Sequence, residues 1–322
     1  MGRFLDQKLT AIQLATLGEK NALVSFLFHT LFEDEAEQAK NQVAPLLGLT
    51  VQHFRQFIEY FQEHGYTFVA PHEIVSGLPK GKFALITFDD GYYNNFRAVP
   101  CLEEYCVPGL FFISTGHVME NRAYWWDVAY RETILQGNTY SDYMAIGREL
   151  KAYRHDELES RIQGRFGAQC LQPVGDLDRP MTPDELVRFA SHDLVHIGNH
   201  TRDHALLTNY DADGVRYQIK RAQTDLHDLL GKTPEFVSYP NGYYSSEIGS
   251  IAHDEGLKMG ITTVTSKTPV PFRFSGTQPM ELGRFMLNSI EPPFPMQLMN
   301  CRSDVRLLHR VKNLFGKGTE AL

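Results

Sequence analysis

The chain has 322 residues, of which 43% are hydrophobic and 22% charged, a balance typical of soluble globular proteins. Its formal net charge is −8, from 39 acidic and 31 basic residues, so the sequence indicates no basic surface for nucleic acid or anionic lipid. The four cysteines, at positions 101, 106, 170 and 301, form no CxxC pair, which argues against a cysteine-built zinc finger and a disulfide-rich scaffold. The length predicts one large domain or two ordinary ones.

Residues 1–21 are interpreted as an N-terminal extension. They do not resemble a secretory signal, because they lack its apolar stretch and small-residue cleavage site. The most apolar early stretch, residues 22–32, is interrupted by polar residues and is shorter than the roughly 20 residues that a spanning helix needs. We therefore expect no transmembrane segment and a cytoplasmic location, either free or peripheral to the inner face of the membrane. The sequence predicts no oligomeric state.

Short apolar runs bounded by turn residues alternate with helical patterns along most of the chain, as in an α/β fold with a parallel sheet. Apolar residues at helical spacing predict helices over residues 50–64 and 215–229, the second of which ends at Gly231. The expected strands cover residues 23–28, 66–69, 83–88, 110–113, 194–197, 236–239, 258–264 and 282–287.

Residues 116–180 depart from this alternation, because they contain no strand-like run and are rich in Tyr, Trp, Arg and Gln. We interpret them as an insertion, helical near 128–135 and 140–153, within a domain that spans residues 22–291. Thr182, followed by Pro183 and two acidic residues, predicts the start of the next helix. Residues 292–322 are expected to form a C-terminal helix, at 303–315, and a tail.

Two adjacent carboxylates, Asp89 and Asp90, follow the apolar strand predicted at residues 83–88. On a regular strand they would point to opposite faces, but a turn at Gly91 brings both to the carboxyl end of the sheet, where the sites of α/β proteins are built. Helix capping by one Asp and solvation of the other is an equally weighted alternative. No phosphate loop accompanies the pair, so a nucleotide site is not predicted.

His200 and His204 lie four residues apart, just beyond another predicted strand. Neutral imidazole is a good ligand for borderline divalent metals. An isolated pair at this spacing is a weak signal, but its position after a strand, like that of the two carboxylates, strengthens it. A third strand runs into Pro240-Asn241-Gly242, which alone is typical of a simple turn.

Together these residues resemble the polysaccharide deacetylase family, which carries the NodB homology domain and is also called carbohydrate esterase family 4. The sequence Thr-Phe-Asp-Asp-Gly at 87–91 matches the first motif of the family in full. His-Thr-Arg-Asp-His at 200–204 matches the second, which is His, then Ser or Thr, two free positions and His. The resemblance covers about residues 22–290 and implies a distorted, TIM-barrel-like (β/α) barrel, here interrupted by the insertion.

The resemblance also implies roles for individual residues. Asp90, His200 and His204 would hold a divalent metal, usually zinc, and Asp89 would be the general base. From the third motif it implies a backbone N–H at Asn241 directed at the oxyanion and substrate contacts at Tyr239 and Pro240.

Two family features have no direct match. The Arg of the third motif is Ser238 here, and Arg284 is a candidate replacement beside Asp89, with a surface ion pair as an equal alternative. The His that would protonate the leaving amine matches only Leu307-Leu308-His309, in the expected C-terminal helix, so residues 124–127 remain an alternative source of the acid. Within that stretch, Trp125 and Trp126 are expected either to stack on a sugar or to anchor the insertion on the barrel. Trp126 is the predicted substrate-binding residue of the two.

The leading hypothesis is a metal-dependent hydrolase that removes N-acetyl groups from the amino sugars of a polysaccharide or glycan precursor. A glycan-binding pseudo-deacetylase is the alternative, although the presence of Asp89 argues against it. A glycosidase with two carboxylates ranks last, because it would need a second acid about 5–9.5 Å across the cleft and would leave both histidines without a role.

Overall fold

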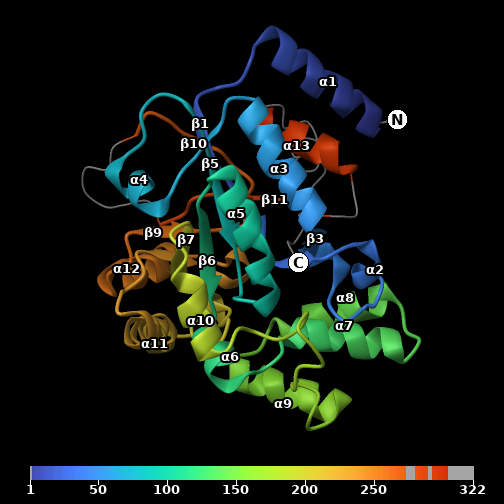
Figure 1. The fold of residues 1–322 in the computed structure, drawn as a ribbon. Coiled ribbons are helices and arrows are strands. Elements are labelled where there is room, and N and C mark those ends of the chain that lie inside the picture. The colour runs from blue at the N-terminus through green and yellow to red at the C-terminus, as the bar shows by residue number, and fades with distance from the viewer. Residues whose placement is uncertain (1, 273–279, 289–291, 304–322) are drawn as a thin grey trace.

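The computed structural model describes residues 2–272, 280–288 and 292–303, and a curved, mainly parallel sheet lies at its centre (Figure 1). The strands run in the order β10-β1-β5-β6-β7-β8-β9, with β4 beside β5 and β11 beside β1. Their bounds are β1 Ala22–Phe28, β4 Thr67–Phe68, β5 Lys82–Phe88, β6 Gly109–Ile113, β7 Val195–Asn199, β8 Phe236–Ser238, β9 Met259–Ile261, β10 Thr268–Pro269 and β11 Phe285–Met286. A separate parallel pair joins β2 (Thr30–Phe32) to β3 (Gly48–Thr50).

Residues 282–286 connect the two sides of this sheet. Leu282 forms a parallel bridge with Ile261 of β9, and Phe285 and Met286 pair in parallel with β1. The sheet therefore curls round on itself, and the predicted distorted (β/α) barrel is confirmed. Since the paired strands from β1 to β9 are parallel, their carboxyl ends meet on one side of the barrel.

Helices connect and cover the strands, and both helices predicted from apolar spacing are present as α3 and α11. The αL backbone of Gly231, with φ of 67°, ends α11, and the Thr182 side chain accepts a hydrogen bond from Glu185 N at the start of α10. Their bounds are α1 Gly2–Thr16, α2 Glu35–Gln38, α3 Val51–Glu63, α4 Pro71–Ser76, α5 Val99–Tyr105, α6 Thr115–Glu120, α7 Trp125–Leu135, α8 Tyr140–Leu150, α9 His155–Phe166, α10 Pro183–Ala190, α11 Ala212–Leu230, α12 Ser246–Asp254 and α13 Phe294–Arg302.

Phenylalanine rings fill the space between α3 and the sheet. Phe26 of β1 lies 4.7 Å from Phe57 between ring centroids, and Phe28 lies 5.2 Å from Phe54. These rings are buried, and burial of each contributes about 1.5–3 kcal/mol to folding. This core holds β1 and β5 in place, and both strands lead into the site.

The insertion forms four helices after β6, α6 to α9. In Figure 1, α7, α8 and α9 lie together at the end of the molecule remote from α1 and α13. Their buried side chains, with Ala44 and Tyr92 of the barrel, form a hydrophobic cluster of their own. The helices expected near 128–135 and 140–153 are thus present as α7 and α8.

Two helices at the ends of the described chain, α1 and α13, were not predicted. The prolines near residue 293 obscure α13, yet Pro295 lies in its first turn, where the helix requires no N–H partner. The helix expected at residues 303–315 lies outside the described residues, apart from Ser303. Across residues 2–272, 280–288 and 292–303, no helix has both the length and the apolar character needed to cross a bilayer.

Candidate active site

Strand β5 brings Asp89 and Asp90 to the carboxyl end of the barrel. Asp89 still follows the strand, since its N–H donates to Phe28 O at 2.9 Å. Asp90 and Gly91 then adopt left-handed conformations, with φ of 79° and 93°. This turn brings both carboxylates to one cavity, as the sequence predicted from Gly91. Such a backbone costs about 1–3 kcal/mol for a residue with a Cβ, and at Asp90 it accompanies the placement of the carboxylate beside both histidines.

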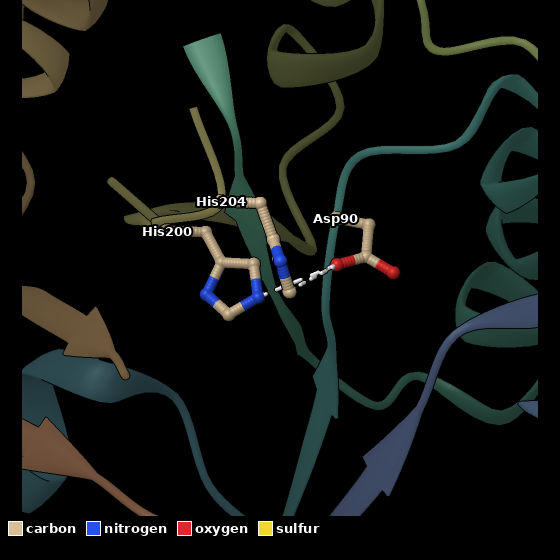
Figure 2. A group of neighbouring side chains, drawn as sticks. All are labelled: Asp90, His200 and His204. Atoms are coloured by element: carbon tan, nitrogen blue, oxygen red, sulfur yellow. Dashed lines mark ion pairs between the residues drawn. The ribbon is translucent and has the colours of Figure 1, made fainter. Parts of the chain in front are cut away.

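His200 and His204 reach the same point from the segment after β7. The chain leaves the strand without forming a helix, because Thr201 and His204 have φ of 65° and 49°. The Nε2 atoms of His200 and His204 lie 3.3 and 3.4 Å from Asp90 Oδ1 (Figure 2). The Nδ1 atom of His200 lies 2.7 Å from Ser238 O, so this nitrogen donates and Nε2 keeps its lone pair toward Asp90.

These three side chains fit a divalent metal. One ligand atom from each lies within 4.8 Å of the others. Both carboxylate oxygens of Asp90 are buried yet accept no hydrogen bond from the described residues, an arrangement that costs about 1–3 kcal/mol per group unless a cation is bound. Burial holds the pKa of His204 well below its usual value, which favours the neutral, ligating form. Two imidazoles and one carboxylate also leave positions for water and substrate, as a catalytic zinc site requires.

Asp89 forms a different contact, a bidentate ion pair with Arg284. Both guanidinium NH groups donate to the carboxylate at 2.7 Å, and Ser238 Oγ donates to Asp89 Oδ2 at 3.1 Å. Arg284 Nη2 also donates to Ser238 Oγ at 3.0 Å. Ser238 and Arg284 therefore share the position beside Asp89, and the surface-pair alternative for Arg284 is wrong, since the side chain is only 1% exposed.

The ionisation of Asp89 follows from these contacts. Burial alone would raise the pKa of Asp89, but the Arg284 guanidinium and His200 outweigh it and hold the pKa below its usual value. Asp89 is thus an anion throughout the physiological range. It lies in the cavity wall, with Oδ2 3.8 Å from His200 Nε2, and is not one of the three side chains that fit a metal, Asp90, His200 and His204, the metal-ligand cluster; a carboxylate placed in this way can accept a proton.

The third motif forms a tight turn after β8. Asn241 has φ of 55° and lines the cavity. Gly242 has φ of 73°, and a Cβ there would lie 2.1 Å from Thr263 Oγ1, so no larger residue fits. The substrate contacts at Tyr239 and Pro240 stay predictions. The Tyr239 ring is fully buried against Tyr244, and neither residue is among those that line the cavity.

Trp126 joins the insertion to the metal-ligand cluster. Its ring lies 4.4 Å from that of His204 between centroids, and its Nε1 donates to Tyr92 Oη at 2.9 Å. Tyr92 donates to Asp127 Oδ2 at 2.6 Å, and Ala44 N donates to Asp127 Oδ1 at 3.2 Å. Burial raises the pKa of Asp127 to about 8. Trp126 thus anchors the insertion, and because it also lines the cavity, stacking on a sugar stays a prediction.

His29, the residue directly after β1, is a site residue that the sequence analysis missed. It lines the cavity, and its charge interacts with those of Asp90 and Asp89. Burial lowers the pKa of His29. The rule that found the other residues, a polar side chain just beyond a strand, would also have found this one. His309 lies outside the described residues, and Asp127, from the other predicted source of the acid, does not line the cavity.

Asp89, Asp90, both histidines of the metal-ligand cluster, Asn241 and Arg284 line one cavity of about 360 Å³. Residues of the barrel and of the insertion line it together. The insertion contributes Trp125, Trp126, Tyr140, Tyr143, Met144, Gly147 and Lys151 to this lining.

Comparison with known proteins matches residues 77–260 to the polysaccharide deacetylase family model. The putative polysaccharide deacetylase YxkH of Bacillus subtilis is 21% identical over 223 residues, which cover 67% of this chain but only 59% of that protein. The Streptococcus pyogenes deacetylase PplD, at 17% identity, aligns with a TM-score of 0.59 over 88% of this chain and 98% of its own. IcaB from Ammonifex degensii, at 18% identity, aligns with a TM-score of 0.57 over 88% of this chain and 99% of its own. Because the family model matches more than half of the sequence, the chain belongs to the polysaccharide deacetylase family.

Proposed function

We propose that the protein is a metal-dependent N-deacetylase that acts on the acetamido group of an amino sugar in a glycan or glycan precursor. The observation that carries this proposal is the pairing of two unlike carboxylates in one cavity. The Asp90 carboxylate faces two imidazoles and accepts no hydrogen bond from the described residues. The Asp89 carboxylate is ionised and accepts two hydrogen bonds from Arg284. One carboxylate suits a metal and its neighbour suits a proton acceptor.

Asp90, His200 and His204 would hold the metal, for which zinc fits the ligand set. When bound, such a metal polarises a carbonyl oxygen and lowers the pKa of water to about 7. Asp89 is placed to accept the proton of the attacking water, and Arg284 orients its carboxylate. The backbone N–H of Asn241 is the candidate hydrogen-bond donor to the oxyanion, since Asn241 lines the cavity.

We propose His29 as the acid that protonates the leaving amine. The water oxygen bonds to the carbonyl carbon as Asp89 takes the proton. The carbon–nitrogen bond then breaks, and the nitrogen takes a proton from His29, which gives acetate and a free amine. Burial lowers the pKa of His29, against the effect of Asp90 and Asp89, so the protonated ring is the minor form at neutral pH but gives up its proton readily.

Two variants test this assignment by separating metal binding from chemistry. Asp89→Asn should keep one divalent metal per chain, measured by elemental analysis, while acetate release from acetylated amino sugars falls by roughly 10²–10⁴-fold. The paired His200→Ala, His204→Ala variant should lose both metal and activity. Acetate release at the rate of the unaltered protein in either variant would contradict the assignment.

A further inference from the structure

The insertion follows β6 and is hydrogen-bonded to barrel segments on both of its own flanks. On one flank, Ala44 N donates to Asp127 Oδ1 at 3.2 Å, and Tyr130 Oη donates to Asn41 Oδ1 at 2.8 Å. Asn41 and Ala44 lie between β2 and β3, so the connection between these strands is fixed against α7. On this flank the insertion and the barrel are therefore in direct contact.

The other flank of the insertion is hydrogen-bonded to the segment between β7 and α11. Asn209 Nδ2 donates to the carbonyl oxygens of Lys151 and Tyr153 at 2.9 and 3.1 Å, and His155 N donates to Tyr210 Oη at 2.8 Å. These bonds lie at the end of α8 and the start of α9. The insertion is therefore held at both sides.

Bulky side chains fill the wall between these two flanks. Trp125, Trp126 and Tyr143 line the cavity, yet each is less than 10% exposed, because they pack into the cluster of the insertion. Tyr140 and Met144 of α8 also line the cavity. Aromatic rings packed in this way have few alternative positions, so the wall is rigid.

The reactive groups lie deep within this enclosure. Asp89, Asp90 and His200 are 3%, 1% and 1% exposed, although all three line the cavity. Its volume of about 360 Å³ is near the lower end of the ~300–1,000 Å³ range of ligand pockets, which suits one sugar ring with its acetamido group.

We propose that the pocket takes its sugar end-on, so that the substrate is the terminal N-acetylated residue of a glycan or a single amino sugar on a larger carrier. This inference rests on the proposed deacetylase function. An internal residue of a polymer has a neighbour on each side and needs a groove open at two ends. The insertion is bonded to the barrel on both of its flanks, and Asp89, Asp90 and His200 are at most 3% exposed, so the proposed pocket has one mouth that admits a single neighbour.

The site of acetate loss within a defined oligomer tests the proposal directly. The full chain, loaded with Zn²⁺, is incubated with the pentamer of β-linked N-acetylglucosamine, and products are sequenced by tandem mass spectrometry. We expect each pentamer to lose one acetate, from the sugar residue at one end. Loss from internal residues would overturn the inference.

A binding measurement gives a second test that does not depend on turnover. Titration of the Zn²⁺-loaded Asp89→Asn variant with the N-acetylglucosamine dimer and pentamer should give affinities within about 2-fold of each other, because further residues lie outside the pocket. A pentamer bound more than 10-fold tighter, or the absence of binding to either sugar, would overturn the inference. Failure of the proposed function is a different result, namely binding without acetate release by the unaltered protein.

Variants of the wall link the outcome to the insertion. Combined Tyr140→Ala and Met144→Ala should open the wall and allow acetate loss from internal residues of the pentamer. The control is Leu135→Ala, on α7 at 74% exposure and outside the cavity lining, which should keep the end-only pattern. An end-only pattern in the wall variant would remove the insertion from this role.

Discussion

The barrel rim and the insertion line the same cavity, but they are stabilised differently. A buried ion pair orders the side chains of the rim, whereas packed aromatic rings order those of the insertion. At the rim, Arg284 fixes Asp89 through two hydrogen bonds of 2.7 Å. In the insertion, Trp126 packs on His204 and bonds through Tyr92 to Asp127. The rim thus presents an ionised carboxylate to the cavity, whereas the insertion lines the cavity with aromatic rings and packs on His204, a ligand of the proposed metal.

Loss of Arg284 should have the largest effect, because it leaves Asp89 buried without its partner. For Arg284→Ala we expect a loss of about 3–5 kcal/mol in the free energy of unfolding. Turnover should fall at least about 10²-fold, since the carboxylate loses its orientation. Denaturant unfolding and acetate release measure the two effects.

Arg216→Ala is the matched control, because Arg216 pairs with Glu255 at the surface and is 42% exposed. An exposed pair of this kind contributes about 0–1 kcal/mol. Equal destabilisation by the two variants would contradict the role given to the buried pair.

Replacement of His29 should follow in size and should affect only the reaction. His29→Gln is expected to lower kcat by roughly 10²–10⁴-fold, the range for general acids, without loss of bound metal. The deficit should shrink for acetate esters with good leaving groups, which need no protonation. An equal deficit for amide and ester substrates would contradict the assignment of His29 as the acid.

Trp126→Phe should have a smaller effect, located at the metal. The phenyl ring still packs beside His204 but loses the hydrogen bond to Tyr92, and we expect Zn²⁺ affinity to fall by about 10-fold. Competition with a fluorescent chelator measures this affinity. Trp125→Phe is the control, because Trp125 lines the cavity without a ring contact to His204. Unchanged Zn²⁺ affinity in Trp126→Phe would show that Trp126 packs in the wall without supporting the metal site.

Asp127→Asn should change the pH dependence of stability. Burial raises the pKa of Asp127 from 3.8 to about 8, so between these values the folded protein binds a proton that the unfolded chain releases. This contribution to stability is complete below pH 3.8 and is lost as pH rises toward 8, by up to about 1.4 kcal/mol per pH unit. Denaturant unfolding at about pH 6 and pH 7 should therefore show a shallower decline for the variant. Identical declines would contradict the raised pKa.

Sequence reasoning worked best where function depends on short local patterns. The strand before Asp89 and the segment with His200 and His204 each combine apolar residues with a turn, so their positions at strand ends followed from the chain itself. Arg284 was harder to assign, because its partner Asp89 lies 195 positions away and only the closing of the barrel brings the two together.

Other features depend on tertiary contacts that leave no local pattern. His29 follows a predicted strand but lacks a motif of its own, and the contact between Ala44 and Asp127 joins segments 83 positions apart. The burial of the Tyr239 ring against Tyr244 also leaves no local pattern. The tryptophans at 125 and 126 indicated an anchor or a sugar platform, and the folded arrangement places Trp126 beside His204 in the cavity wall.

The most direct test of the proposed function is acetate release from acetylated amino sugars by the full chain, measured before chelation, after chelation and after Zn²⁺ is restored. The account predicts release that is abolished by the chelator and recovered with one Zn²⁺ per chain. Release that continues at full rate in the chelated, metal-free protein would contradict it.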